Sequence, residues 1–288
     1  MKLVKTSLII LNIWCTVSGI SFAFLMCPYF LFPYMAGSVF GLFTDFGVSP
    51  ELQYYLAFAV NFAMIISITM LFENRSSLMI GNRFRITKCL HRFLWISGNF
   101  VGCMGVVTPV FLNLPDQMGA KLKILKTLPC PTSEFFTEST LVLAADGFWD
   151  KYTKSACLSI YLCLTLQVIF FTSCCIYYLF ISKSSQASSQ TRRLQVRSFF
   201  AIIFQTFIPI LLYLVPLMVF MKKGKEEKYD QLKNNMMFIT ICFQNGITSL
   251  SILLVHHPYR NFLKSLIFMK EGDAGRVVYV ASDLSIRA

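Results

Sequence analysis

Six long stretches of this sequence contain no charged residue, and they constrain the fold more than any other feature. A membrane-spanning helix needs about 20 mostly apolar residues, within a range of roughly 17 to 25. Five stretches fit one helix each, and the first is longer, with Pro28 and Pro33 breaking its second half. The sequence therefore predicts an all-α polytopic membrane protein with six transmembrane helices at about 7–27, 52–72, 93–113, 156–181, 198–221 and 234–255.

Two alternatives compete with this interpretation. A soluble all-α protein would need a polar exterior, but only 14% of the residues are charged, whereas soluble globular domains average about 25%. The N-terminus also resembles a secretory signal peptide, because Lys2 and Lys5 precede an apolar run and Val17 and Gly19 offer small residues for cleavage. That run continues to Phe43, which favours a retained membrane anchor.

The basic residues are distributed unevenly between the two sides of such a protein. One side holds 16 of the 26 Lys and Arg residues against four acids, in the N-terminus, 73–92, 183–197 and the tail from residue 256. The other side holds ten Lys and ten acids, in 45–51, 116–154 and 222–233. Because positive residues in short loops are retained in the cytoplasm, we expect both termini of this chain to be cytoplasmic. The net charge of +12 then reflects topology and attraction to anionic membrane lipids, and it requires no nucleic-acid partner.

The composition of the spans argues against two functional classes. None of the six predicted helices contains Asp, Glu, Lys, Arg or His, although ion-coupled and proton-coupled transporters normally keep ionisable groups at mid-membrane. No zinc-protease, nucleophile-elbow or phosphate-loop motif is present, so we expect no enzyme and no cofactor. The three histidines lie at the predicted inner ends, and a metal site is not expected.

Uncharged amides form the polar set within the spans. They are Asn12, Asn61, Asn99, Gln167, Gln205, Gln244 and Asn245. The usual role of such groups is hydrogen bonding between helices. The alternative is a pocket for a small neutral ligand, and its candidate lining residues are Asn61, Gln205, Gln244 and Asn245.

Most of the ten cysteines lie inside predicted spans, where a thiol behaves as a small apolar group. Cys130 stands alone in the long outer loop, and Cys27 is its candidate partner near the outer face. Sequence alone does not bring the two together, so a Cys27–Cys130 disulfide is a hypothesis and a free thiol is the alternative.

The inner ends of the helices carry the remaining motifs. Glu73 and Arg75 lie two positions apart, so they do not face each other on one helix, and Arg75 needs a partner on another helix or on a bound protein. Pro258 ends or bends the last span. Beyond it, apolar residues recur at helical spacing and predict a short amphipathic helix at about 259–269, lying in the membrane interface. Residues 1–270 then form a single domain, and residues 271–288 form a largely disordered cytoplasmic tail.

These motifs together resemble those of the nematode serpentine chemoreceptors, most closely class H of the Str superfamily of G-protein-coupled receptors. The matching elements are Pro33 with Gly37 and Gly41, Phe72-Glu73-Asn74-Arg75, Pro115-Asp116-Gln117, Leu128-Pro129-Cys130, Thr191 with Leu194-Gln195, Gln205 with Pro209, Gly246 with Ser249, and His257-Pro258-Tyr259-Arg260. Each is weak alone, but their order and spacing from about residue 8 to 264 are specific.

The resemblance implies a receptor for a small environmental molecule in the plasma or ciliary membrane of sensory neurons, coupled to a heterotrimeric G protein. It further implies an inner switch and G-protein-coupling region made of Glu73, Asn74, Arg75, Thr191, Gln195, Pro258, Tyr259 and Arg260. In this resemblance Glu73-Asn74-Arg75 corresponds to the inner end of the third helix of such receptors.

The sequence departs from the family pattern at its N-terminus. These receptors have seven spans, and the segment Lys2–Phe43 resembles their second helix and the outer segment that follows it. We therefore expect a bundle that lacks the family's first helix, either because the gene model is incomplete or because the receptor is truncated. The alternative functions are a non-signalling membrane subunit, a passive channel, or an incomplete gene product without receptor activity.

Overall fold

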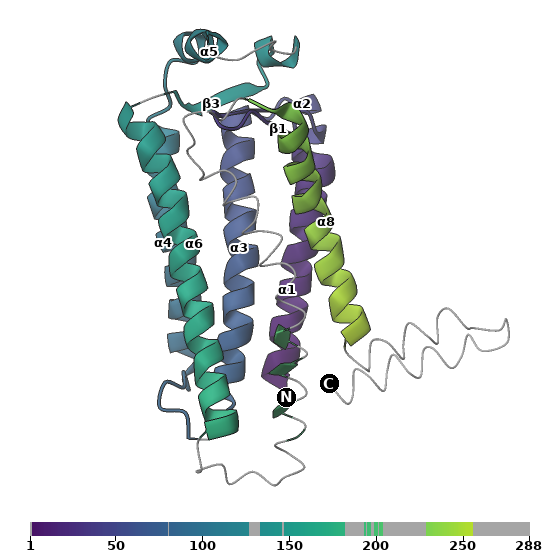
Figure 1. The fold of residues 1–288 in the computed structure, drawn as a ribbon, viewed down its shortest axis with the longest axis vertical. Helices are drawn as coiled ribbons and strands as arrows, with labels where there is room; N and C mark the ends of the chain where they lie inside the picture. The colour runs from purple at the N-terminus through teal and green to yellow at the C-terminus, as the bar shows by residue number, and fades with distance from the viewer. Residues whose placement is uncertain are drawn as a thin grey trace, which may run out of the picture.

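A bundle of long helices dominates the computed structural model, with a small β-sheet and a short helix across one end (Figure 1). The structure describes residues 2–79, 81–126, 133–145, 147–181, 193, 195–196, 199–200, 202–203 and 229–255. Within these residues the long helices are α1 (Lys2–Ile20), α3 (Pro50–Ser77), α4 (Cys89–Leu112), α6 (Gly147–Ile176) and α8 (Gln231–Val255). Two π-helical segments, Ser21–Met26 and Tyr177–Ile181, extend α1 and α6.

The helices lie where the uncharged stretches predicted them. Among the described residues, four segments are long and apolar enough to cross a membrane: Thr6–Met26, Pro50–Ser77, Cys89–Leu112 and Gly147–Ile181. The helix predicted at 234–255 is α8. Most of the span predicted at 198–221, the amphipathic helix at 259–269 and the boundary at residue 270 lie outside the described residues.

Helix α3 is the central element of the bundle. It packs against α1, α4 and α6, and 61% of its most apolar segment is buried, against 22% for α4. Pro50 occupies the first turn, where a missing N–H costs nothing, and the Ser49 hydroxyl accepts the Leu52 N–H as an N-cap. Because α3 runs through the whole bundle, groups at its two ends share one rigid element.

A three-stranded antiparallel sheet covers one end of the bundle. Its strands are β1 (Pro28–Phe30), β2 (Met35–Val39) and β3 (Thr140–Ala144), with β2 in the centre. Every residue of β2 and β3 is buried, and the Ser38 hydroxyl hydrogen-bonds that of Thr140 at 2.6 Å. We call this region, residues 28–49, 113–126 and 133–145, the sheet end; the opposite region, residues 2–7, 73–79, 81–92 and 177–181, is the basic end.

Two short helices complete the sheet end, α2 (Leu42–Asp45) and α5 (Gln117–Leu125). Asp116 caps α5 by accepting the Gly119 N–H at 2.9 Å. The Gln117 amide pairs with the backbone of Val142 in both directions, its Oε1 accepting the N–H at 2.9 Å and its Nε2 donating to the oxygen at 3.2 Å. The Pro115-Asp116-Gln117 motif therefore fixes α5 against strand β3.

Helix α8 is attached to the same sheet. The Asn234 amide donates to the oxygen of Phe32 at 3.1 Å, and the Gln231 amide donates to that of Phe30 at 3.4 Å. Asp230 precedes the helix, and its pKa lies below the ordinary value because its carboxylate accepts the Lys233 N–H, with the Lys233 ammonium nearby. The start of α8 is thus tied to the turn between β1 and β2.

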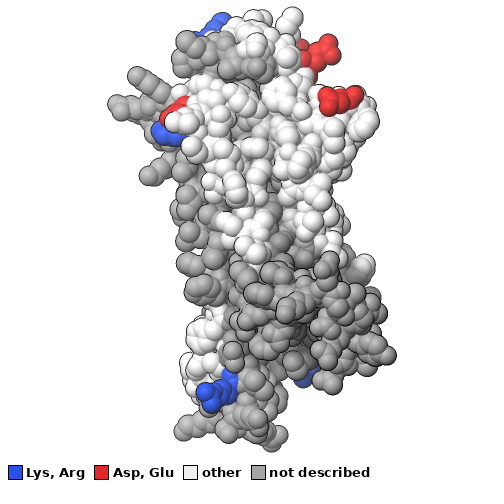
Figure 2. Space-filling view, turned by 90° about the vertical axis from the view of Figure 1, so that its right-hand side faces the viewer, with Lys and Arg blue, Asp and Glu red and all other residues white. Residues whose placement is uncertain are grey.

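Charged side chains gather at the two ends of the described surface. In Figure 2 the Lys, Arg, Asp and Glu residues lie toward the top and bottom of the molecule, and the white band between them carries none. A surface of this kind suits a protein whose middle contacts hydrocarbon and whose ends contact water.

Candidate functional site

A cavity of about 180 Å³ lies beneath the sheet, between α1, α3, α6 and α8. Its wall is mostly aromatic, aliphatic and methionine side chains, and no charged residue lines it in the part of the chain that the structure describes. The lining residues are Phe22, Met26, Pro28, Phe30, Phe32, Met35, Ala36, Gly37, Val39, Gln53, Tyr54, Ala57, Phe58, Asn61, Leu143, Thr153, Cys157, Tyr161, Met237, Phe238 and Ile241.

The residues of α3 in this wall follow its helical period. Gln53, Ala57 and Asn61 are each four positions apart, so they lie along one face over about 12 Å at 1.5 Å per residue. Gln53 is fully buried, and its Nε2 donates to the Val48 oxygen at 2.8 Å and to the Thr44 hydroxyl at 3.2 Å. A backbone carbonyl can only accept, so the amide nitrogen faces Val48 and Oε1 faces away from it.

Of the amides proposed from sequence to line a pocket, the structure places Asn61 in the wall. Gln244 is 2% exposed and buried in α8, but it is not a residue of this wall, which on α8 ends at Ile241. The side chain of Asn245 and all of Gln205 lie outside the described residues. Sequence reasoning missed Gln53, although an amide in register with Asn61 inside an uncharged stretch was a usable signal.

At the basic end, α3 carries a buried polar cluster. Glu73, Asn74 and Arg75 are 0%, 3% and 7% exposed. Both carboxylate oxygens of Glu73 bind Arg92 at the start of α4, Oε2 accepting from Nε at 2.9 Å and Oε1 from Nη2 at 3.2 Å. The Ser77 hydroxyl donates to Oε1 at 2.7 Å. Glu73 therefore links the end of α3 to the start of α4.

Arg75 points elsewhere, as its spacing from Glu73 predicted. Its Nη2 donates to the backbone oxygen of Gln195 at 3.0 Å, which links α3 to the segment before the predicted fifth span. Its buried Nε has no hydrogen-bond partner among the described residues. Asn74 donates from Nδ2 to the Ser7 hydroxyl on α1. Three consecutive residues thus contact three different parts of the bundle.

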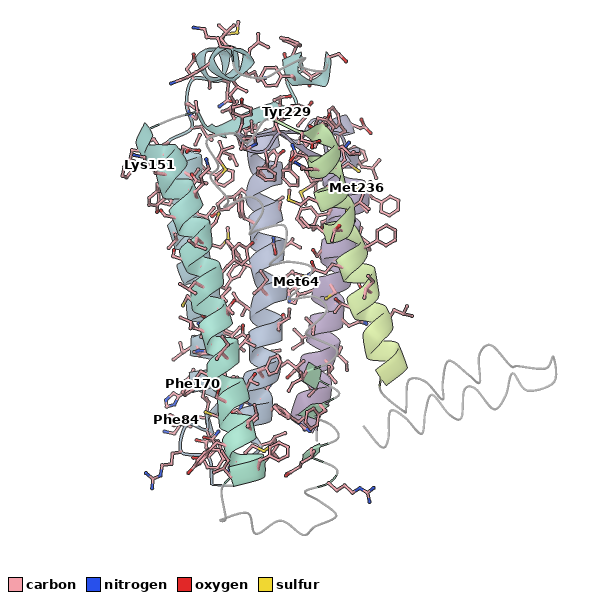
Figure 3. The ribbon with its side chains drawn as sticks, viewed as in Figure 1. Met64, Phe84, Lys151, Phe170, Tyr229 and Met236 are labelled. Carbon is pink, nitrogen blue, oxygen red and sulfur yellow. The ribbon has the colours of Figure 1, made fainter. Side chains whose placement is uncertain are left out.

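The segment between α3 and α4 folds back onto this cluster. Asn82 donates from Nδ2 to both the backbone oxygen and the hydroxyl of Ser76, each at 2.8 Å. Phe84 packs edge-on against Phe170 of α6, with ring centroids 5.3 Å apart, and Figure 3 shows the two rings together at the basic end, far from Lys151 and Tyr229 at the sheet end. Arg92 and Asn82 were missed from sequence, because nothing in their spacing relates them to α3.

Several predicted site residues lie outside the described residues, namely Thr191, Pro258, Tyr259, Arg260 and Cys130. The Cys27–Cys130 disulfide therefore stays a prediction; Cys27 donates its thiol to the Ala23 oxygen at 2.9 Å. Among the described residues, no three or more His, Cys, Asp or Glu side chains gather in an arrangement that could hold a metal ion.

Comparison with known proteins identifies the family of this chain. The model of the family "Serpentine type 7TM GPCR chemoreceptor Srh" matches residues 1–269. The chain belongs to the Srh family. It is 43% identical to Serpentine receptor class H-72 of Caenorhabditis elegans over 286 residues, which cover 99% of this chain and 81% of that protein. No solved structure matches this Srh chain.

Membership of the Srh family shows that the helical bundle lies in a membrane. The chain is a multi-pass membrane protein of the G-protein-coupled chemoreceptor type, and its long apolar helices are membrane spans. The family is one of receptors, whose general partners are a G protein and a small ligand. In this Srh receptor the cavity and the Glu73–Arg75 cluster lie at opposite ends of α3.

Proposed function

We propose that this receptor binds a small environmental molecule in the cavity beneath the sheet and signals through a heterotrimeric G protein at the basic end. The proposal places the basic end in the cytoplasm of a sensory neuron, with the receptor in its plasma or ciliary membrane. The excess of basic residues on that side supports this orientation.

One observation carries the proposal: the helix that lines the cavity also carries, at its other end, a buried arginine whose Nε has no hydrogen-bond partner among the described residues. Asn61 and Arg75 are 14 residues apart on α3, or about 21 Å at 1.5 Å per residue. A buried guanidinium without a full set of hydrogen-bond acceptors is costly, and ionisable groups inside membrane proteins usually mark functional sites.

The contacts of the cluster suggest how a ligand acts. In the arrangement described here, Arg75 donates to Gln195 and Glu73 is held by Arg92. A ligand that fits the cavity better in a second arrangement of the helices shifts the population toward it. We propose that Arg75 leaves Gln195 in that arrangement and its freed donors contact the G protein.

The test is Arg75→Ala in an assay of ligand-evoked G-protein activation, with surface expression measured in parallel. We expect signalling to fall at least tenfold while surface expression stays within about twofold of the unmodified receptor, because among the described residues Arg75 makes one hydrogen bond, to Gln195. Arg85→Ala is the matched control, since Arg85 is an exposed arginine in the loop between α3 and α4.

Two outcomes would contradict the proposal. Unchanged signalling by Arg75→Ala removes Arg75 from the mechanism, and an equal loss with Arg85→Ala assigns the effect to net basic charge. Ligand-independent conductance in a chain that activates no G protein would support the passive-channel alternative.

A further inference from the structure

Building on the proposed function, we infer the chemical class of the ligand: a compact, neutral and apolar molecule about the size of benzene. The volume of the cavity beneath the sheet and the state of each polar side chain in its wall favour this class over lipid-like molecules, amines, acids and alcohols.

The volume favours small ligands. The cavity holds about 180 Å³, and an engineered apolar protein cavity of about 150 Å³ stays dry and binds benzene. A fatty acyl chain or a sterol needs several times that space. The sheet covers the outer side, and Gly37 of β2 lies so close to α3 that an added Cβ would come within 2.4 Å of the Tyr54 hydroxyl. Strand β2 and helix α3 are therefore tightly packed at this part of the wall.

The wall also excludes charged ligands. Its described residues include no Asp, Glu, Lys, Arg or His, so an ammonium or carboxylate would be buried without a counter-ion among them. The cost of burying an unpaired charge is far larger than the cost of burying a neutral polar group. Amines and carboxylic acids in their charged forms are therefore poor ligands for this cavity.

Hydroxyl-bearing ligands are disfavoured less strongly, because the polar atoms of the wall are either hydrogen-bonded or covered by neighbouring atoms. The amide nitrogen of Gln53 donates to Val48 and Thr44, whereas its Oε1 has no hydrogen-bond partner among the described residues but is covered. The Tyr54 hydroxyl donates to the Ser38 oxygen at 3.4 Å, and that of Thr153 to the Trp149 oxygen at 2.8 Å. The Oδ1 of Asn61 is covered as well, and both Asn61 and Tyr161 have an interaction partner. A ligand O–H would lose its hydrogen bonds on entering.

The apolar part of the wall favours soft, polarisable ligands. Methionines from three elements line it, Met26, Met35 and Met237, together with phenylalanines from α3, α8 and the β1 region. Thioether sulfur and aromatic rings attract one another, and ring edges pack well against ring faces. A small aromatic compound or a small neutral thioether is the best match.

The experiment compares two probes of nearly equal size, 1,4-difluorobenzene and 4-fluorophenol. Binding to the receptor in lipid nanodiscs is followed by ¹⁹F NMR, with empty nanodiscs correcting for partition into lipid. We expect saturable binding of 1,4-difluorobenzene. Relative to its concentration in the bilayer, 4-fluorophenol should bind roughly tenfold to a hundredfold more weakly, as expected for one unpaired buried hydroxyl.

Three variants place the binding in this cavity. Ala57→Phe fills the α3 wall and should abolish saturable binding, whereas the matched control Leu56→Phe adds the same ring at a neighbouring position that is 39% exposed and should leave binding unchanged. Phe58→Ala enlarges the cavity and should allow 1-fluoronaphthalene to bind, which also covers the case in which Ala57→Phe fails to fold.

The outcomes separate this inference from the proposed function. Saturable binding of 4-fluorophenol as tight as that of 1,4-difluorobenzene overturns the apolar class, yet leaves the cavity as the ligand site. Binding that persists in Ala57→Phe, or no saturable binding of either probe, overturns the size and place assigned to the ligand. The Arg75→Ala experiment reports on G-protein coupling and is independent of both results.

Discussion

The ion pair between Glu73 and Arg92 is the residue-scale feature with the clearest energetic consequence. The Glu73 side chain is fully buried and that of Arg92 is 16% exposed. Arg92→Leu leaves a buried carboxylate with only the Ser77 hydroxyl as a described partner, and breaking a buried pair in this way typically costs about 3–5 kcal/mol. We expect a much lower midpoint of thermal unfolding for the purified receptor.

The double variant Glu73→Gln/Arg92→Leu distinguishes this cause from lost packing. A neutral amide can still accept from Ser77, so most of the stability should return, and a double-mutant cycle measures the coupling between the two residues. If the double variant is as unstable as Arg92→Leu alone, the buried charge is not the cause.

At this scale the sequence predicted how residues close together in the chain are placed better than it predicted contacts between distant segments. The two-residue spacing of Glu73 and Arg75 predicted that they do not pair on one helix, and the structure confirms it. The partners themselves, Arg92 and Gln195, were not predictable from spacing, because they depend on how the segment after α3 folds back and where another helix begins. Gln53 was missed for a different reason: it stands two residues after Glu51, at the start of the uncharged stretch, where a polar side chain is ordinary for a helix end.

Strand β2 and the turn after it contain the strongest steric requirements at the scale of an element. A Cβ at Gly37 would lie 2.4 Å from the Tyr54 hydroxyl, and one at Gly41 would lie 2.3 Å from the Leu25 backbone oxygen. Overpacking of this kind costs about 1–3 kcal/mol or more. We expect Gly37→Ala and Gly41→Ala to lower the unfolding midpoint, and Tyr54→Phe to rescue Gly37→Ala in part by removing the nearest atom.

Gly98 of α4 provides the control for this prediction. An added Cβ there meets nothing within 4 Å, and Ala is favoured over Gly in a helix interior by about 1 kcal/mol. Gly98→Ala should therefore be neutral or stabilising. A Gly41→Ala variant as stable as Gly98→Ala would show that the backbone approach between residues 25 and 41 is not required.

The elements differ in how well the sequence predicted them, and the reason is physical. Each long helix is a continuous uncharged stretch of suitable length, so a local count was sufficient. The sheet escaped prediction because all five residues of β2, Met-Ala-Gly-Ser-Val, are buried and show no alternation of polar and apolar residues. Its pairing partner β3 begins about a hundred residues later, at Thr140, and only the tertiary fold brings the two together.

At the scale of the whole molecule, α3 connects the two regions to which the proposed function assigns ligand binding and G-protein coupling. Its first half lines the cavity and its last turn carries the polar cluster, while α1, α4 and α6 pack around it. Between the two regions, Met64, Ile68 and Leu71 are buried against Leu11 of α1. Because close-packed interiors transmit strain, the proposed function predicts that a shift of α3 at the cavity reaches the basic end.

The orientation of the whole molecule in its membrane can be tested with new glycosylation sites. Thr137→Asn creates the acceptor triplet Asn-Glu-Ser at the sheet end, and Arg85→Asn creates Asn-Ile-Thr at the basic end; both positions are exposed. Only the side translocated across the membrane during synthesis is glycosylated, so we expect a glycosidase-sensitive mass shift for Thr137→Asn and none for Arg85→Asn. The native triplet at Asn74 should give no background, because Asn74 is 3% exposed within α3. The opposite pattern would place the basic end outside the cell and would remove the proposed G-protein contact of Arg75.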